Sequence, residues 1–169
     1  IGQSRPKTVI RLKDAAAGFG PGAERAVLAF FLLQKGSNVN LGNVIENLTI
    51  DTGKGNPGAV GLRWNSSNWG GVRNVAIRSG DGLGCVGLMM DRRNATGYHH
   101  DIAVDGFDTG MVLRGGGETV VALEYATLSG QHKTAIQAGY AGGGNCLSAR
   151  KVLVAGAPVA LRAGPSAQV

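Results

Sequence analysis

The stretch NVAIRSGDGLGCVGL, from Asn74 to Leu88, holds two short apolar strands joined by the glycine-rich loop SGDGLG. The first strand alternates apolar and polar residues, which is typical of a strand with one buried face. A hairpin would reverse the chain in a tight turn. Here Asp81 stands between two glycines, which favours a chain that bends sharply and continues around a coil.

The phrase that opens this stretch recurs along the chain at intervals of 27, 27, 24 and 26 residues, as NLTID (47–51), NVAIR (74–78), DIAVD (101–105), YATLS (125–129) and KVLVA (151–155). A second short strand follows each of them, as AVGLRW (59–64), CVGLMM (85–90), TGMVLR (109–114), TAIQA (134–138) and PVALR (158–162). A looser first turn is expected over 8–12 and 26–30, where the second segment is a strand or a short helix. Such a period predicts a solenoid, and because the leucine-rich-repeat consensus is absent, we expect a parallel β-helix.

Alternation within the repeats assigns residues to the interior. The first strands are expected to point Leu48, Ile50, Val75, Ile77, Ile102, Val104, Ala126, Leu128, Val152 and Val154 inward. The second strands are expected to stack Leu62, Leu88, Met111, Ile136 and Ala160 as an inner column. A sharp corner before each first strand carries Asn47, Asn74 and Asp101, which tolerate the left-handed conformation and can bond from coil to coil. Tyr125 and Lys151 are expected to end that ladder.

The composition suits one domain with a substantial core: 169 residues, of which 43% are hydrophobic and 17% charged. We expect residues 1–169 to form a single β-helix domain, with a looser coil over 1–43 and regular coils over 44–164. The chain is expected to be either a mature product or a piece cut from a longer chain. No apolar run is long enough to cross a membrane. The net charge of +6 is scattered, which indicates a solvated basic surface or attraction for an acidic partner such as a uronate polymer or nucleic acid. Cys85 and Cys146 are expected to stay unpaired.

Several phrases resemble the pectate-lyase-type right-handed parallel β-helix family, which includes bacterial glycoside-hydrolase-related proteins: NLTIDTGKGNPGAVGL, VRNVAIRSGDG and VDGFDTG. The resemblance runs from about Thr8 to Arg162. It implies an all-β, right-handed parallel β-helix of about six coils, a polysaccharide partner and a secreted or cell-surface location. The signatures Asn-Thr-Asp, Gly-His-Gly and Arg-Ile-Lys are missing from the chain. Catalytic residues must therefore be argued from the site itself.

Two columns of polar residues are predicted at the loop that follows each first strand. One column holds Asp51, Arg78, Asp105 and Ser129, and the other holds Lys54, Asp81, Asp108 and His132. Residues one coil apart would have Cα atoms about 5 Å from each other. Glycosidic hydrolysis needs two carboxylates about 5–9.5 Å apart, so Asp81, Asp108 and Asp105 are the expected catalytic residues. Charge neutralisation between coils explains the same columns without any catalysis.

Expected substrate-binding residues are Arg78, Lys54, Asp51, His132, Trp64 and Trp69, and either tryptophan can instead belong to the core. Hydrolysis requires no cofactor. The alternative is a uronate lyase, with Arg78 or Lys54 as the base and Ca²⁺ held by Asp81, Asp105 and Asp108. A third hypothesis is a non-catalytic carbohydrate-binding or structural solenoid.

His99 and His100 are adjacent, so they are expected to point to opposite faces of their strand. No metal site is therefore predicted there. Neither nucleic acid nor a membrane is an expected partner. The uncapped last coil suggests end-on self-association or further C-terminal chain.

Overall fold

In the computed structural model, which describes residues 1–30, 41–66, 69–91, 96–114, 119–139, 145–165 and 167–169, the chain forms strands and turns, with no helix in these ranges. One set of strands comprises β1 (Val9–Arg11), β3 (Val44–Asp51), β5 (Gly71–Arg78), β7 (Gly97–Asp105), β9 (Thr119–Ser129), β11 (Asn145–Ala155) and β13 (Ala167–Gln168). The other set comprises β2 (Arg25–Phe30), β4 (Ala59–Trp64), β6 (Val86–Met90), β8 (Thr109–Leu113), β10 (Thr134–Ala138) and β12 (Val159–Ala163).

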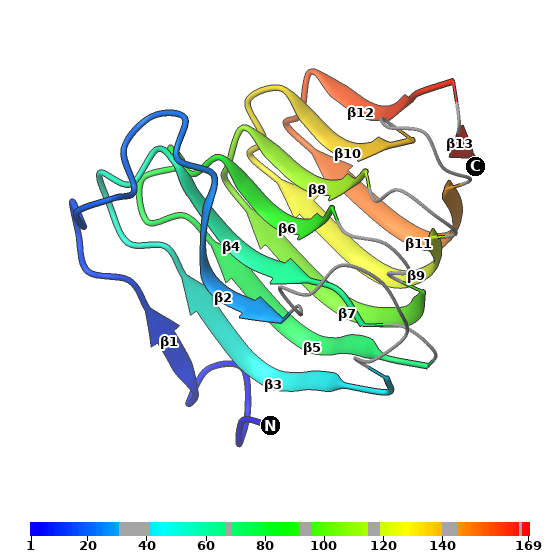
Figure 1. Ribbon diagram of the computed structural model, residues 1–169, viewed down its shortest axis with the longest axis horizontal. Coiled ribbons are helices and arrows are strands. Elements are labelled where there is room, and N and C mark those ends of the chain that lie inside the picture. Colours follow the sequence, from blue (N-terminus) through cyan, green and yellow to red (C-terminus); the bar gives the residue numbers. More distant parts are fainter. Residues whose placement is uncertain (31–40, 67–68, 92–95, 115–118, 140–144, 166) are drawn as a thin grey trace.

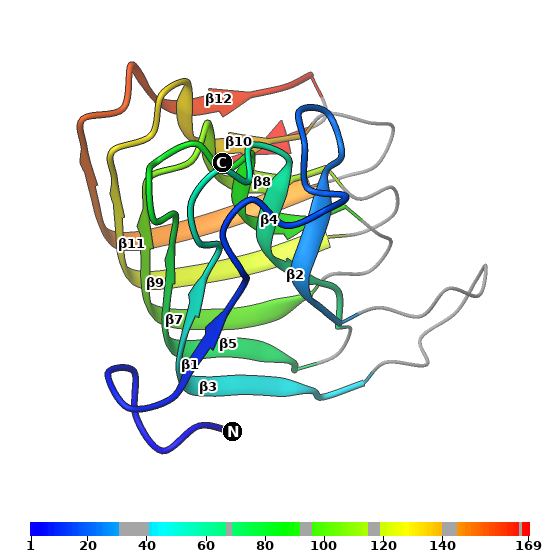
Figure 2. The ribbon, with the colours of Figure 1, turned by 90° about the vertical axis from the view of Figure 1, so that its left-hand side faces the viewer.

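The two sets make two parallel sheets, because each turn of the chain adds one strand to each. Sheet A has the order β1-β3-β5-β7-β9-β11-β13, and sheet B has the order β12-β10-β8-β6-β4-β2. Figure 1 shows the stack, with the two termini at opposite ends, and Figure 2 shows β3 to β11 lying one above another. The parallel β-solenoid predicted from the repeats is confirmed. About four turns are regular. Of the outer strands, β1 and β12 are mostly exposed and β2 is mostly half-buried.

The register within sheet A matches the repeat found in the sequence. Leu48 pairs with Val75 and Val75 with Ile102. Ile102 pairs in turn with Ala126, and Ala126 with Val152. The segment 26–30, which the sequence left open between strand and helix, lies in strand β2. The expected solenoid rows are thus true neighbours in space.

The corner of each sheet A strand lies at a residue with positive φ. The φ angles are +61° at Asn47, +49° at Asn74 and +55° at Asp101, and the amide of Asn74 donates to Asn47 Oδ1 at 2.8 Å. Tyr125 and Lys151 keep the same corner, with φ of +53° and +54°, although neither is an asparagine. Lys151 Nζ donates instead to the Tyr125 hydroxyl at 3.0 Å and lies over its ring. The amide ladder ends as expected, but the corner itself continues with different chemistry.

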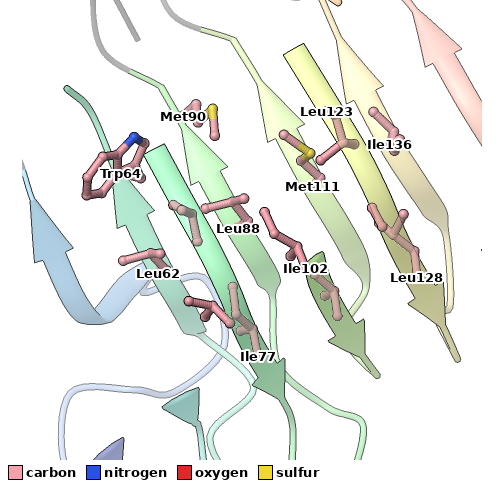
Figure 3. Packing of buried hydrophobic residues seen from close by; sticks show 14 of the residues in the cluster. Leu62, Trp64, Ile77, Leu88, Met90, Ile102, Met111, Leu123, Leu128 and Ile136 are labelled. Atoms are coloured by element: carbon pink, nitrogen blue, oxygen red, sulfur yellow. The ribbon is translucent and has the colours of Figure 1, made fainter. Parts of the chain in front are cut away.

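The core fills the narrow space between the two sheets. Figure 3 shows leucine, isoleucine and methionine side chains of sheet B facing those of sheet A. Leu62, Leu88, Met111 and Ile136 form the predicted inner column. Its next member is Leu161 and not Ala160, because Ile136 pairs with Leu161. The repeat from β10 to β12 is therefore one residue longer than the spacing predicted from the sequence repeats.

Candidate functional site

The first predicted column, at the end of the sheet A strands, is confirmed by the register. Asp51 pairs with Arg78, Arg78 with Asp105, and Asp105 with Ser129. Arg78 Nε donates to Asp51 Oδ2 at 2.9 Å, and the Ser129 hydroxyl donates to Asp105 Oδ1 at 2.8 Å. Asp51 is buried and also accepts a hydrogen bond from the backbone of Gly53. These contacts neutralise the charges or satisfy the hydrogen bonds of stacked polar groups. They agree with the alternative interpretation of this column, in which it neutralises charge between coils.

The second predicted column is wrong between Asp81 and Asp108. The flanking sheet A residues Arg78 and Asp105 are 27 positions apart, whereas the flanking sheet B residues Val86 and Thr109 are only 23 positions apart. The loop that contains Asp81 is therefore four residues longer than the loop of the next coil. Asp108 lies beside Cys85 as a result, and its N–H donates to the carbonyl of Gly84 at 2.8 Å.

Asp81 holds its own loop against the preceding coil. Its carboxylate accepts hydrogen bonds from Gly55 N at 2.6 Å, Leu83 N at 3.1 Å and the Ser79 hydroxyl at 3.3 Å. Partial burial would raise the pKa of Asp81, but these hydrogen bonds outweigh it and lower the pKa below its ordinary value. Lys54 lies next to this loop, with an exposed side chain. Asp81 is thus engaged as a loop-forming residue.

Asp108 lies just before β8 and faces the following coil. Its Oδ2 accepts from Lys133 Nζ at 2.7 Å, and His132 Nδ1 is 3.8 Å from its Oδ1. The hydrogen bond to Asp108, followed by the negative charge of Asp108, raises the pKa of the Lys133 ammonium group. Asp108 and His132 therefore do meet, as predicted, and the structure adds Lys133.

On the outer side of sheet B lies a second cluster of buried apolar residues, separate from the core and made of Val60, Val86, Met89 and Val112, each at most 5% exposed. Leu88 and Met90 belong to the core, so alternation turns Met89 to the outer side. Cys85 packs against this cluster and is half-buried. We call this cluster with Cys85 the sheet B face.

Charged side chains surround the sheet B face. Glu24, just before β2 and with a φ of +41°, accepts from Arg114 Nη2 at 2.7 Å. Arg63 Nη2 lies 3.1 Å from both the carbonyl oxygen of Glu24 and the sulfur of Met89. The Arg114 guanidinium thus links the end of β8 to the loop before β2.

The thiol of Cys85 is partly buried, and its pKa is raised. Burial raises this pKa first, and the negative charges of Glu24 and Asp108 raise it further. Asp108 is one coil from Cys85 in the sheet B register, and β2, which follows Glu24, is two coils away on the other side.

Sequence reasoning missed Glu24, Arg63 and Arg114. Glu24 and Arg114 are 90 positions apart, and no periodic signal connects them. The outward positions of the second strands, such as Arg63 and Met89, follow the same alternation as the core and would have indicated this face.

The two tryptophans have opposite environments. Trp64 is fully buried and lies 5.5 Å from Phe30 between ring centroids, so it takes the core role and cannot stack on a sugar. Trp69 is 88% exposed. His99 is buried and His100 partly exposed, as predicted for neighbours on one strand. Both cysteines are free, as expected.

The proposed calcium ligands are not brought together. Within the part of the chain that the structure describes, no three His, Cys, Asp or Glu side chains gather closely enough to hold a metal ion. Asp81 bonds toward the preceding coil, whereas Asp108 bonds toward the following one. The same described ranges contain no helix that is long and apolar enough to cross a membrane.

Comparison with protein families identifies a match over residues 1–154, to the model described as rhamnogalacturonase A/epimerase, pectate lyase-like. The chain belongs to this family. The pectate lyase-like assignment agrees with the parallel solenoid and indicates a polysaccharide-active protein. No curated protein and no solved structure matches the chain. Pectate lyase-like folds carry several chemistries, so the reaction has to be argued from the residues around the sheet B face.

Proposed function

We propose that this protein hydrolyses an acidic polysaccharide on the sheet B face, with Glu24 and Asp108 as the pair of catalytic carboxylates. The observation that carries the proposal is that Glu24 and Asp108 both border the sheet B face and that each is paired with a cation, Arg114 and Lys133 respectively. Their side chains are 42% and 38% exposed, so both remain accessible to a ligand. Glycosidic hydrolysis requires two carboxyl groups about 5–9.5 Å apart. The strands beside Glu24 and Asp108 are three coils apart, about 14 Å, so both side chains have to reach toward one bond of the bound polymer.

The cations explain why the substrate would be acidic. In the free protein Arg114 pairs with Glu24, and Lys133 pairs with Asp108. A uronate carboxylate of the substrate can pair with Arg114 or Lys133 and so displace the protein carboxylate from that cation. The carboxyl group released from that cation serves as the general acid, and the other serves as the base or nucleophile.

The test is a screen of purified polysaccharides with two readouts. Polygalacturonate, rhamnogalacturonan, alginate and hyaluronate are compared with the neutral polymers xylan and glucomannan. New reducing ends measure cleavage, and absorbance at about 235 nm detects the double bond that only elimination creates. We expect reducing ends from at least one acidic polymer without that absorbance.

Variants assign the carboxylates. Glu24→Gln and Asp108→Asn are each expected to lower kcat at least about 100-fold, as loss of a general acid or base does. Asp101→Asn is the matched control, because it changes an exposed carboxylate at a corner where asparagine also fits. Asp81→Asn tests the loop rim that the sequence favoured, and we expect it to stay active.

Three outcomes contradict the proposal. An unsaturated product would indicate a lyase, and binding without any product would indicate a non-catalytic solenoid. Full activity in both Glu24→Gln and Asp108→Asn would remove these carboxylates from the reaction.

A further inference from the structure

A pocket of about 310 Å³ lies on the outer side of sheet A, away from the sheet B face. It is lined by Trp69, Thr96, Gly97, Tyr98, Val120 and Ala122. Tyr98 pairs with Ala122 across β7 and β9, so these side chains are neighbours on adjacent coils. Val121 is buried in the core, which turns Val120 outward, where it is 47% exposed.

Two exposed aromatic side chains, Trp69 and Tyr98, line the pocket. Trp69 is 88% exposed and Tyr98 is 40% exposed, although both are large and apolar over most of their surface. The small residues Gly97 and Ala122 also line the pocket. An exposed aromatic surface beside a hollow is a common mark of a binding site, because aromatic rings contribute much contact area at low cost in conformational entropy.

A hydrogen-bonded network borders the pocket. The Tyr98 hydroxyl donates to Glu124 Oε2 at 3.0 Å. Arg150 donates to the same carboxylate through Nε at 3.0 Å and Nη2 at 2.8 Å, in a two-point arrangement. The Arg150 hydrogen bond and then the Tyr98 hydrogen bond lower the pKa of Glu124, so this carboxylate stays ionised.

We propose that this pocket is a second carbohydrate site, which binds an uncharged pyranose unit. A pyranose has an apolar C–H face and a rim of hydroxyl groups, which match the Trp69 and Tyr98 rings and the Glu124–Arg150 pair respectively. The charges favour a neutral sugar over a uronate, because the lining residues carry none and Glu124 is balanced by Arg150. The site goes beyond the proposed hydrolysis, since it requires no cleavage.

A second site on a different face would hold the polymer near the sheet B face. Two linked binding events raise the effective concentration of the second one, without any new contact at the first. Loss of the pocket is therefore expected to weaken binding of long polymers and to leave turnover of short substrates unchanged.

The experiment measures binding of neutral hexasaccharides (cellohexaose, xylohexaose and mannohexaose) by calorimetry and by tryptophan fluorescence, with trigalacturonate as the acidic comparison. The chain has two tryptophans, and Trp64 is buried. A saturable spectral shift thus reports on Trp69. We expect at least one neutral hexasaccharide to bind, and Trp69→Ala to weaken it about tenfold.

Further variants separate stacking from folding. Tyr98→Phe keeps the ring but removes the hydrogen bond to Glu124, and is expected to weaken binding less than Trp69→Ala does. Leu153→Ala is the matched control, because it removes an apolar side chain that is 61% exposed and does not line the pocket. The melting temperature of Trp69→Ala should equal that of the wild type, since its ring lies in solvent.

The proposal is overturned if no neutral hexasaccharide binds, if trigalacturonate alone binds, or if Trp69→Ala binds as well as the wild type. These outcomes are independent of the hydrolysis proposal. Glu24→Gln and Asp108→Asn should retain hexasaccharide binding, and Trp69→Ala should retain kcat on short acidic substrates.

Discussion

Acidification from pH 7 to pH 5 is expected to destabilise the protein through His99. This ring is fully buried on β7, and the Val72 N–H donates to its Nδ1 at 3.1 Å. The neutral ring therefore carries its proton on Nε2, and protonation at Nδ1 would break that hydrogen bond and bury a charge. Burial, followed by the charges of Arg73 and His100, lowers the pKa of His99 from 6.5 to about 3.

The sign and size of the effect follow from linkage. Below pH 6.5 the unfolded chain binds a proton at this histidine, whereas the folded protein stays neutral until the pH approaches 3. The stability contributed by the neutral ring is complete above pH 6.5 and is lost progressively as the pH falls. One pKa unit corresponds to about 1.4 kcal/mol, so the loss between pH 7 and pH 5 is about 2 kcal/mol.

The measurement is urea unfolding at pH 5, 6 and 7, followed by the fluorescence of buried Trp64. Wild type should lose about 2 kcal/mol more between pH 7 and pH 5 than His99→Asn does. The substitution also leaves a cavity, so the change with pH is compared and not the absolute stability. His132→Asn is the control, and it should keep the pH-dependent loss because His99 remains. Equal losses in wild type and His99→Asn would refute the reasoning, since they would show that burial does not keep the ring neutral.

Three further predictions concern the frame that carries the sites. Asn74→Ala should lower the free energy of unfolding by about 1–2 kcal/mol in urea titrations, because it removes the hydrogen bond to Asn47 and places alanine at a φ of +49°; an unchanged midpoint would show that the ladder adds nothing. Gly87→Ala should destabilise by about 1–3 kcal/mol in thermal unfolding, since its Cβ would collide with Val104 inside the solenoid; a wild-type melting temperature would contradict this packing. Asp81→Asn should reduce stability at pH 7, and the difference from wild type should shrink as the pH falls through and below 3.8, because the lowered pKa stabilises only the ionised form; a difference independent of pH would remove the charge from the explanation.

Much of the fold could be predicted because a solenoid repeats local physics. The alternation in NVAIR and DIAVD places Val75 above Ile102, and the structure keeps that register. The corner at Asn74 also follows from the sequence, because few residues tolerate positive φ. Tyr125 shows the limit of this reasoning, since the neighbouring coils hold it in the corner conformation without an amide ladder.

The candidate site was less predictable because it depends on loops. Asp81 and Asp108 look equivalent when they are counted from the end of the first strand, yet four additional residues in one loop separate them. The contact between Glu24 and Arg114 joins positions 90 apart. Neither arrangement has a period that the sequence could reveal.

By itself the sequence determined the period, the inward and outward faces of the strands and the parallel stacking. These depend on hydrophobic alternation and on the backbone ladder, which every coil repeats. Only the tertiary structure decided which loop side chains meet, that Trp64 is core while Trp69 is exposed, and that Glu24 pairs with Arg114. Unequal loop lengths shift side chains relative to the repeating ladder, so their neighbours are set by the stacked coils and not by the spacing along the chain.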